Sequence, residues 1–401
     1  MPLLFADFVV DVDAFELRRG GVPIKVEPQV FDLIVFLAGN PGRVLSKHDI
    51  AQSVWHGRAI SDSAISSRIN AARHALGDDG TAQRFIKTIH GRGFRFDPGP
   101  QTGSPLAQAE PQSADQLGSV AVRYCRTSDG VNVAYGETGQ GVPLVKAAAF
   151  MTHIQYDSDG ILHRDWIKSF TKFCRYIRYD ERGNGLSDWS ISDFSFEKMV
   201  ADLEAVIDEL ELKRFVLLGS SQGASVSIAY AHRHPERVAG LILYGGYAAG
   251  WRRSSDLKHR DKREALLELA RVCWGDDNPT GRQAYAALFY PDGTPAQHSE
   301  FMKLQRDTVT PDNAFRIMDT FAEIDVRHLL PSIRVPTLVM HVKDDAVVPL
   351  NAGKDMACGI KGAEFVILEG RNHIIQSTDP GWTRFTSEMR DFVHRHSDQV
   401  N

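Results

Sequence analysis

The hydrophobic pattern of the first 97 residues predicts a small α+β domain. Apolar residues occur in short runs up to residue 18, as in strands, and recur at helical spacing from residue 28 onward. The pattern predicts strands over residues 3–10 and 15–18, helices over 28–38, 46–54 and 61–76, and two further strands over 84–89 and 94–96. Ser46 and Ser61 are suitable N-caps for the second and third helices. Three helices followed by a β-hairpin form the plan of a winged helix-turn-helix.

The pattern stops over residues 98–119. This stretch is rich in Pro, Gly, Ser and Gln and has almost no apolar periodicity, which is typical of a flexible linker. We therefore expect one domain over residues 1–97 and a second over residues 120–401.

After the linker, apolar strand-like runs alternate with helix-like segments. Strands are predicted over residues 142–147, 175–179, 215–218, 239–244, 337–341 and 364–368. Such alternation is typical of an α/β domain with a mostly parallel sheet. Between residues 249 and 331 charged helical segments replace the alternation, which predicts a helical cap inserted into this domain.

Composition indicates the cellular compartment and shows which part of the chain could bind nucleic acid. The 401 residues are 43% hydrophobic and 24% charged, with a formal net charge of -5, so the chain as a whole is not a basic nucleic-acid binder. Between Arg58 and Arg95, however, 7 Lys and Arg stand against 3 Asp and Glu, as on a surface that meets phosphates. The four cysteines are far apart, and no stretch resembles a signal peptide or membrane span. We therefore expect a soluble cytoplasmic protein with reduced thiols and no membrane partner.

The third predicted helix has one apolar and one polar side. Ile65, Ile69, Ala72 and Leu76 share the apolar side, which we expect to pack inward. Small polar residues, Asn and Arg can contact base edges or phosphates in a major groove. For any single candidate residue taken alone, a solvated helix face or a surface turn is the favoured interpretation. The candidate DNA contacts are Ser63, Ser66, Ser67, Asn70, Arg73 and His74 on this helix, and Arg92 at the hairpin tip.

Residues 5–97 resemble the winged-helix effector domain of OmpR/PhoB-type response regulators. The resemblance rests on EPQVFDL at 27–33, VLSK at 44–47, Val54-Trp55, NAAR at 70–73 leading to Leu76-Gly77-Asp78, and IKTIHGRGFRF at 86–96. In that family the third helix enters the major groove and the hairpin forms the wing, so the resemblance implies double-stranded DNA as a partner. A homodimer is expected, because one winged helix reads only a short half-site. No phospho-acceptor domain precedes the winged helix here, so we expect its signal to come from the C-terminal domain.

A second group of residues indicates nucleophilic catalysis. The run Gly219-Ser220-Ser221-Gln222-Gly223 follows an apolar strand and precedes a small-residue helix, which is the context of a nucleophile elbow. A serine hydroxyl needs a base to accept its proton and an acid to orient that base. Asp344 and Asp345 follow one predicted strand and His373 follows another, in the order Ser, Asp, His. Ligands gather at the carboxyl ends of such strands.

Residues 120–396 resemble the α/β-hydrolase superfamily, close to its small esterases and C–C hydrolases. The supporting motifs are RYDERGNGLSD at 178–188 and AYAHRHPERV at 229–238. By this resemblance Ser221 is the nucleophile, His373 the general base and Asp345 the acid. Asp345 is preferred because it precedes Pro349 by four residues, as in the family's D-x-V-x-P pattern, and Asp344 is the alternative.

An oxyanion hole needs two backbone N–H donors. We expect them from Gln222 and Phe150. Many relatives have His-Gly or Pro-Gly before the second donor, whereas this chain has three alanines, at 147–149. A loop without glycine has less conformational freedom, so we expect weaker turnover than the triad alone indicates. Further candidate pocket residues are His153, Asp157, Ser220 and Trp251, although structural hydrogen bonding explains His153 and Asp157 equally well.

These observations support a ligand-responsive transcriptional regulator. Its hydrolase-like domain would bind a small ester, lactone or related carbonyl compound, and hydrolyse it slowly or not at all. The alternative is an active serine esterase with an accessory DNA-binding domain, and a third reading is an interaction module with both sites degenerate. No metal-ligand cluster or phosphate-binding glycine loop is evident, so we expect no cofactor and no metal.

Overall fold

The computed structural model describes residues 3–11, 16–55, 62–78, 81–89, 92–98, 120–276 and 278–400. The chain divides into two compact units, Met1–Ser113 and Ala114–Asn401. Apart from residue 98, the predicted linker lies outside the described residues. No helix in the described ranges is long and apolar enough to span a membrane.

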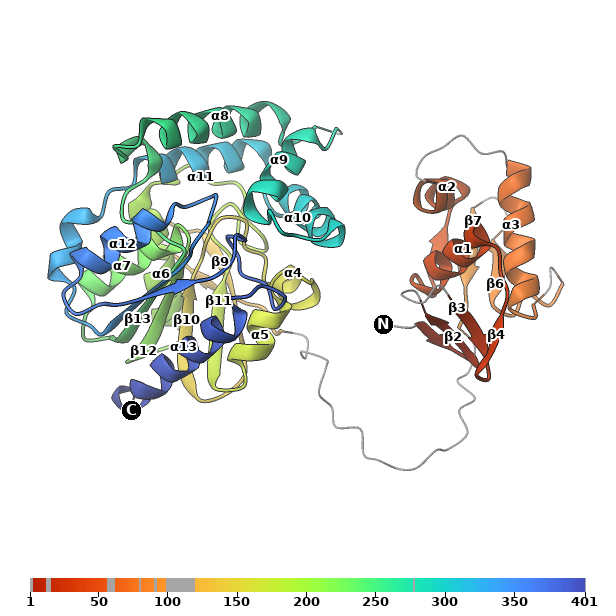
Figure 1. The fold of residues 1–401 in the computed structure, drawn as a ribbon, viewed down its shortest axis with the longest axis horizontal. Coiled ribbons are helices and arrows are strands. Elements are labelled where there is room, and N and C mark those ends of the chain that lie inside the picture. Colours follow the sequence, from red (N-terminus) through yellow and green to blue (C-terminus); the bar gives the residue numbers. More distant parts are fainter. Residues whose placement is uncertain are drawn as a thin grey trace. The chain divides into compact units, whose positions relative to one another are not determined.

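The N-terminal unit is a winged helix (Figure 1). It begins with the antiparallel sheet β1 (Leu3–Phe5), β2 (Phe8–Asp11), β3 (Glu16–Arg19) and β4 (Val22–Ile24). Next come α1 (Pro28–Ala38), β5 (Val44–Leu45), α2 (Lys47–Trp55), α3 (Asp62–Ala75), β6 (Ile86–Ile89) and β7 (Gly93–Phe96), with β5, β7 and β6 paired in a second sheet. The single strand predicted over 3–10 is wrong, because a turn at Ala6, with φ 46°, divides it into β1 and β2.

The core of this unit confirms the predicted apolar side of the third helix. Ile65, Ile69, Ala72 and Leu76 are all buried and belong to the same cluster as the apolar residues of α1. Ser46 caps α2 as predicted, because its Oγ accepts a hydrogen bond from Asp49 N at 3.1 Å. Ser61 lies outside the described residues.

The C-terminal unit is built on an eight-stranded sheet, with helices on both faces (Figure 1). The strands are β8 (Arg123–Arg126), β9 (Asn132–Thr138), β10 (Val142–Ala147), β11 (Cys174–Tyr179), β12 (Phe215–Ser220), β13 (Val238–Tyr244), β14 (Thr337–Val342) and β15 (Glu364–Leu368), in the order β15-β14-β13-β12-β10-β11-β9-β8. From β10 to β15 all pairs are parallel. The antiparallel strands β8 and β9 were not predicted, because polar residues and a glycine interrupt their apolar pattern.

Helices cover the two faces of this sheet with separate apolar clusters. On one face pack α6 (Phe196–Glu209), α7 (Gly223–Arg233) and α12 (Leu350–Gly359). On the other pack α5 (Arg164–Phe170) and α13 (Trp382–Arg395). Burial on both faces explains why the central strands read as continuous apolar runs in the sequence.

Four helices between β13 and β14 form the cap: α8 (Leu257–Cys273), α9 (Thr280–Phe289), α10 (Pro295–Thr308) and α11 (Pro311–Glu323). Figure 1 shows them together above the sheet, in green to light blue. Thr294 and Thr310 cap α10 and α11 by accepting hydrogen bonds from backbone N–H groups, and a proline follows each as the first helical residue.

Candidate active site and DNA-contacting surface

A sharp turn between β12 and α7 presents Ser221. Its φ is 53°, in the left-handed region that a residue with a side chain rarely adopts, and its N–H donates to Tyr244 O at 2.9 Å. A Cβ at Gly219 would lie 2.6 Å from Ala224 Cα, and one at Gly223 would lie 2.7 Å from Ala148 O. The two glycines therefore allow strand, helix and neighbouring loop to approach closely enough for this turn.

Three strand ends bring a serine, a histidine and an aspartate into one hydrogen-bonded chain. His373 Nε2 lies 3.0 Å from Ser221 Oγ, and His373 Nδ1 lies 2.6 Å from Asp345 Oδ2. The other carboxylate oxygen of Asp345 accepts hydrogen bonds from the N–H groups of Val347 at 2.8 Å and Val348 at 3.0 Å. Asp344 is exposed and outside this chain, so the geometry favours Asp345 over the alternative.

Buried groups fix the position of the histidine. His373 N donates to Phe289 O at 2.9 Å, and the Tyr244 hydroxyl donates to His373 O at 2.8 Å. The Phe289 ring packs edge-on against the imidazole, with centroids 5.3 Å apart. Since Phe289 belongs to cap helix α9, the cap holds His373 directly.

A second histidine, His341, lies behind the aspartate. Its Nε2 is 2.9 Å from Val348 O and 3.8 Å from Asp345 Oδ2. Burial lowers the pKa of His341, which favours the neutral ring, and the bond to Val348 O makes Nε2 the protonated nitrogen. His341 therefore supports the loop that carries Asp345.

The two predicted oxyanion donors border the same cavity as Ser221. Phe150 follows β10, and Gln222 stands at the N-terminus of α7, where the helix dipole favours negative charge. Among the described residues neither backbone N–H donates a hydrogen bond. The loop adopts its bend through Met151, whose φ is 63°, and not through a glycine. This left-handed Met151 is a feature that the sequence did not indicate.

A cavity of about 70 Å³ connects these groups with the cap. Of the predicted pocket residues, Ser220 and Asp157 line it together with Ser221, Phe150 and Gln222. His153 does not, because its ring caps α4 (Ile154–Asp159), with Nδ1 accepting from Tyr156 N at 3.4 Å. The cap aromatic residues Tyr290 and Phe301 also line the cavity. The sequence did not identify five further lining residues, Lys146, His163, Arg263, Tyr285 and Met318.

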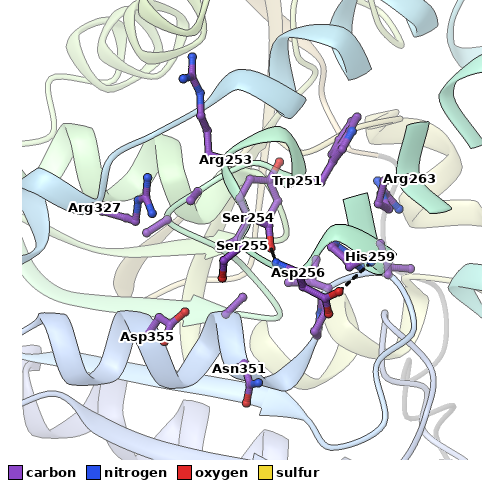
Figure 2. Close-up of a pocket in the computed structure, with 17 residues that line it drawn as sticks. Trp251, Arg253, Ser254, Ser255, Asp256, His259, Arg263, Arg327, Asn351 and Asp355 are labelled. Carbon is purple, nitrogen blue, oxygen red and sulfur yellow. Dashed lines mark hydrogen bonds between the residues drawn. The ribbon is translucent and has the colours of Figure 1, made fainter. Parts of the chain in front are cut away.

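Trp251 faces a second, larger cavity of about 410 Å³ (Figure 2). Its indole N–H donates to Glu264 at 2.7 Å, and the guanidinium of Arg263 lies 4.8 Å from its ring centroid. The expectation that Trp251 lines the serine cavity is wrong, because sequence position alone did not distinguish the two cavities. Tyr247, Arg263, Val347 and Val348 line both of them and therefore form the wall between them.

Comparison with known proteins agrees with both parts of this description. Residues 160–380 match the family model of the alpha/beta hydrolase fold, and residues 21–96 match that of the transcriptional regulatory protein C-terminal domain, the OmpR/PhoB type. The chain belongs to the alpha/beta hydrolase fold family.

Several hydrolase-fold relatives match this chain over most of their own length. The AB hydrolase superfamily protein YisY of Bacillus subtilis is 24% identical over 62% of this chain and 91% of its own length. The non-heme chloroperoxidase CPO-A1 of Kitasatospora aureofaciens is 25% identical over 68% of this chain and 99% of its own. A solved esterase from Exiguobacterium antarcticum superposes with a TM-score of 0.58 at 24% identity, covering 68% of this chain and all of its own, which shows the shared fold.

In the hydrolase domain the buried loop after β11, which carries Glu181 and Arg182, contacts the turn at Ser221. Gln222 Nε2 donates to Glu181 Oε1 at 2.7 Å, and burial raises the pKa of Glu181 to about 8. Beside it, Arg182 Nη2 lies 2.6 Å from Asp202 Oδ1 on α6, and both side chains are fully buried. This ion pair fixes the loop after β11 to the helix layer.

In the OmpR/PhoB-type domain three of the predicted DNA contacts on α3 are exposed to solvent. Ser67, Asn70, His74 and the wing residue Arg92 are exposed, and Ser66 is half-buried. The side chain of Ser63 lies outside the described residues.

Arg73 differs from its neighbours on α3. It is only 5% exposed, and its Nε and Nη2 donate to Ile86 O at 3.0 and 2.7 Å, while Nη2 also contacts Thr88 Oγ1 at 2.8 Å. The expectation that Arg73 holds DNA is therefore wrong. Its long side chain reaches inward from the edge of the helix and fixes α3 to the wing strand β6.

Proposed function

We propose that this protein regulates transcription in response to a small ester, lactone or related carbonyl compound that binds at Ser221. The hydrogen-bonded chain Ser221–His373–Asp345 beneath a cap carries this proposal, because it pairs a reactive group with a cavity. The same polypeptide carries a DNA-binding domain of transcriptional regulators. The hydrolase domain is the ligand-binding part of this proposal.

The chemistry follows the family's acyl transfer. Ser221 Oγ attacks the carbonyl carbon while its proton passes to His373 Nε2, and the carbonyl π pair moves onto oxygen. The N–H groups of Gln222 and Phe150 donate to that oxyanion. When the tetrahedral intermediate collapses, the bond to the leaving oxygen breaks, that oxygen takes the proton from His373, and the acyl group stays on Ser221. Water then attacks the acyl group by the same route.

The lifetime of the acyl group separates a sensor from an enzyme. A long-lived acyl-serine, or a compound bound without reaction, keeps the cavity occupied and can change the affinity of the chain for its operator. A coupling of about 1–3 kcal/mol would change that affinity about 5–150-fold. We expect the DNA-bound form to be a homodimer on a two-half-site operator.

DNA binding measured with and without ester tests the proposal. Operator affinity of the full chain is measured by fluorescence anisotropy, before and after treatment with activated esters and lactones, for wild type and Ser221→Ala. We expect at least a five-fold change in operator affinity for wild type. If the response requires acylation of Ser221, the change in Ser221→Ala should be smaller or absent. If no compound that labels Ser221 changes operator affinity, the regulatory proposal fails.

A working serine hydrolase is the second candidate, favoured by the complete Ser–His–Asp chain. Sustained turnover above about 1 s⁻¹ that disappears in Ser221→Ala would support it. A single burst of product equal to the protein concentration supports the sensor instead.

A further inference from the structure

We propose that the compound bound at Ser221 carries a carboxylate, and that Lys146 Nζ and Tyr290 Oη bind this group. The proposal rests on the proposed function and names its substrate class: half-esters, or lactones with a free acid group. The same cavity would then hold the reacting carbonyl at Ser221 and the carboxylate at the Lys146 and Tyr290 wall.

Lys146 is a buried lysine in the central sheet. It is 8% exposed, stands on β10 directly beside Arg178 of β11, and borders the serine cavity. Among the described residues its ammonium has no hydrogen-bond or ion-pair partner, whereas a buried charge is ordinarily paired. An apolar side chain would fill this strand position at lower cost, so the ammonium favours a polar ligand.

The carboxyl groups of Asp157, Asp180 and Glu181 act electrostatically on Lys146, but none of them forms an ion pair with it in the described structure. Asp157 is shared, since its Oδ2 lies 3.5 Å from Arg178 Nη1 and its Oδ1 lies 3.1 Å from His163 Nδ1. Burial raises the pKa of Asp180 to about 8, so this carboxyl is mostly neutral at pH 7. Burial lowers the pKa of Lys146, and the nearby guanidinium of Arg178 lowers it further. A ligand carboxylate beside Lys146 Nζ would complete an ion pair and so favour the ammonium form.

Tyr290 supplies a second free donor on the cavity wall. Its side chain is fully buried, yet its hydroxyl has no hydrogen-bond partner in the described structure. Tyr285 borders the same cavity, but its hydroxyl donates to Leu266 O at 2.7 Å. The hydroxyl of Tyr290 is thus available to a ligand, whereas that of Tyr285 is already used by the protein.

A carboxylate matches these donors better than a neutral group. Its two oxygens can accept from the ammonium and the phenol together and also neutralise the ammonium. An amide or ester oxygen would satisfy the hydroxyl but leave the charge of Lys146 uncompensated. Arg263, whose Nη1 also has no hydrogen-bond partner among the described residues, stands on the wall between the two cavities and is the competing anchor.

Matched activated esters test the proposal in the full-length protein. The rate constant for acylation of Ser221 is measured with mono-(4-nitrophenyl) glutarate, which carries a carboxylate, and with neutral 4-nitrophenyl pentanoate. A second pair places the carboxylate on the alcohol side of the ester. We expect wild type to prefer the anionic member of one pair at least ten-fold.

The variants locate the anchor. The preference for the anionic ester should fall below two-fold in Lys146→Met. In Tyr290→Phe it should fall to about a third of the wild-type preference. The matched control Tyr285→Phe should keep the wild-type preference. Thermal unfolding midpoints confirm that each variant is folded. Equal rates for both members of both pairs, or a preference that survives Lys146→Met and disappears in Arg263→Gln, would overturn the proposal. If no ester acylates Ser221 and none changes operator affinity, the proposed function itself fails.

Discussion

The hydrolase domain and the DNA-binding domain hold their candidate functional groups in opposite ways. In the hydrolase domain Ser221, His373 and Asp345 are bonded to one another and to buried backbone groups. In the DNA-binding domain Asn70 and His74 point into solvent from α3. The buried site therefore has a fixed geometry before a ligand arrives, whereas the exposed side chains of α3 are not fixed in this way. Substitutions in the hydrolase-domain site should therefore reduce activity or stability far more than substitutions on the exposed face of α3.

Removal of the proposed nucleophile is expected to have the largest effect. Ser221→Ala should lower the rate of acyl transfer from activated esters at least about 10³-fold, because the substitution removes the hydroxyl that would form the acyl bond. The change removes only a hydroxyl, so the thermal unfolding midpoint should stay within a few degrees. Burst kinetics with 4-nitrophenyl esters measure the rate. A variant that still forms the acyl-protein at the wild-type rate would mean that Ser221 is not the nucleophile.

The sequence predicted those parts of the site that depend on local spacing. Gly219 and Gly223 flank Ser221 because a sharp turn requires them, and this requirement is visible in five residues. The sequence could not predict the direction in which long side chains extend. Arg73 lies at the edge of its helical wheel, and only the tertiary fold decides that it turns inward to Ile86.

The cavity was harder to predict than the elbow. His153 and Trp251 are close to the site along the chain or within the cap, but only the packed cap decides which cavity each one faces. Lys146 was missed because one lysine in an apolar strand has no periodic signature. Its burial follows from the neighbouring strands β11 and β12, which are distant in sequence.

Breaking the buried ion pair between Arg182 and Asp202 should have the next largest effect, on the stability of the hydrolase domain. Asp202→Ala leaves the fully buried guanidinium of Arg182 without its main partner, which costs about 3–5 kcal/mol of unfolding free energy. Urea unfolding of the hydrolase transition measures this cost. Asp208→Ala is the matched control, because it breaks an arginine–aspartate pair whose acid is 66% exposed, and should cost at most about 1 kcal/mol. Equal losses in the two variants would contradict the distinction between buried and exposed groups.

Arg73 extends the comparison into the winged helix. Arg73→Met removes two buried hydrogen bonds and one partly buried hydrogen bond between α3 and β6, and should destabilise this domain by about 2 kcal/mol. Arg68→Met on the same helix breaks only a solvent-exposed pair with Glu27 and should cost less than about 1 kcal/mol. Unfolding of the N-terminal domain, followed by circular dichroism, provides the measurement. If Arg73→Met left stability unchanged and weakened only DNA binding, the inward assignment of Arg73 would be wrong.

The smallest expected effect belongs to the exposed face of α3. Asn70→Ala should not change unfolding, because its side chain is exposed, but should weaken operator binding by about 1 kcal/mol, roughly five-fold, if Asn70 contacts a base edge. Arg92→Ala on the wing should weaken binding to operator and non-specific DNA alike and lower the salt dependence by about one phosphate contact. Anisotropy titrations at several salt concentrations separate the two behaviours. A loss of stability in Asn70→Ala, or unchanged binding in both variants, would show that this face of α3 and the wing do not meet DNA as proposed.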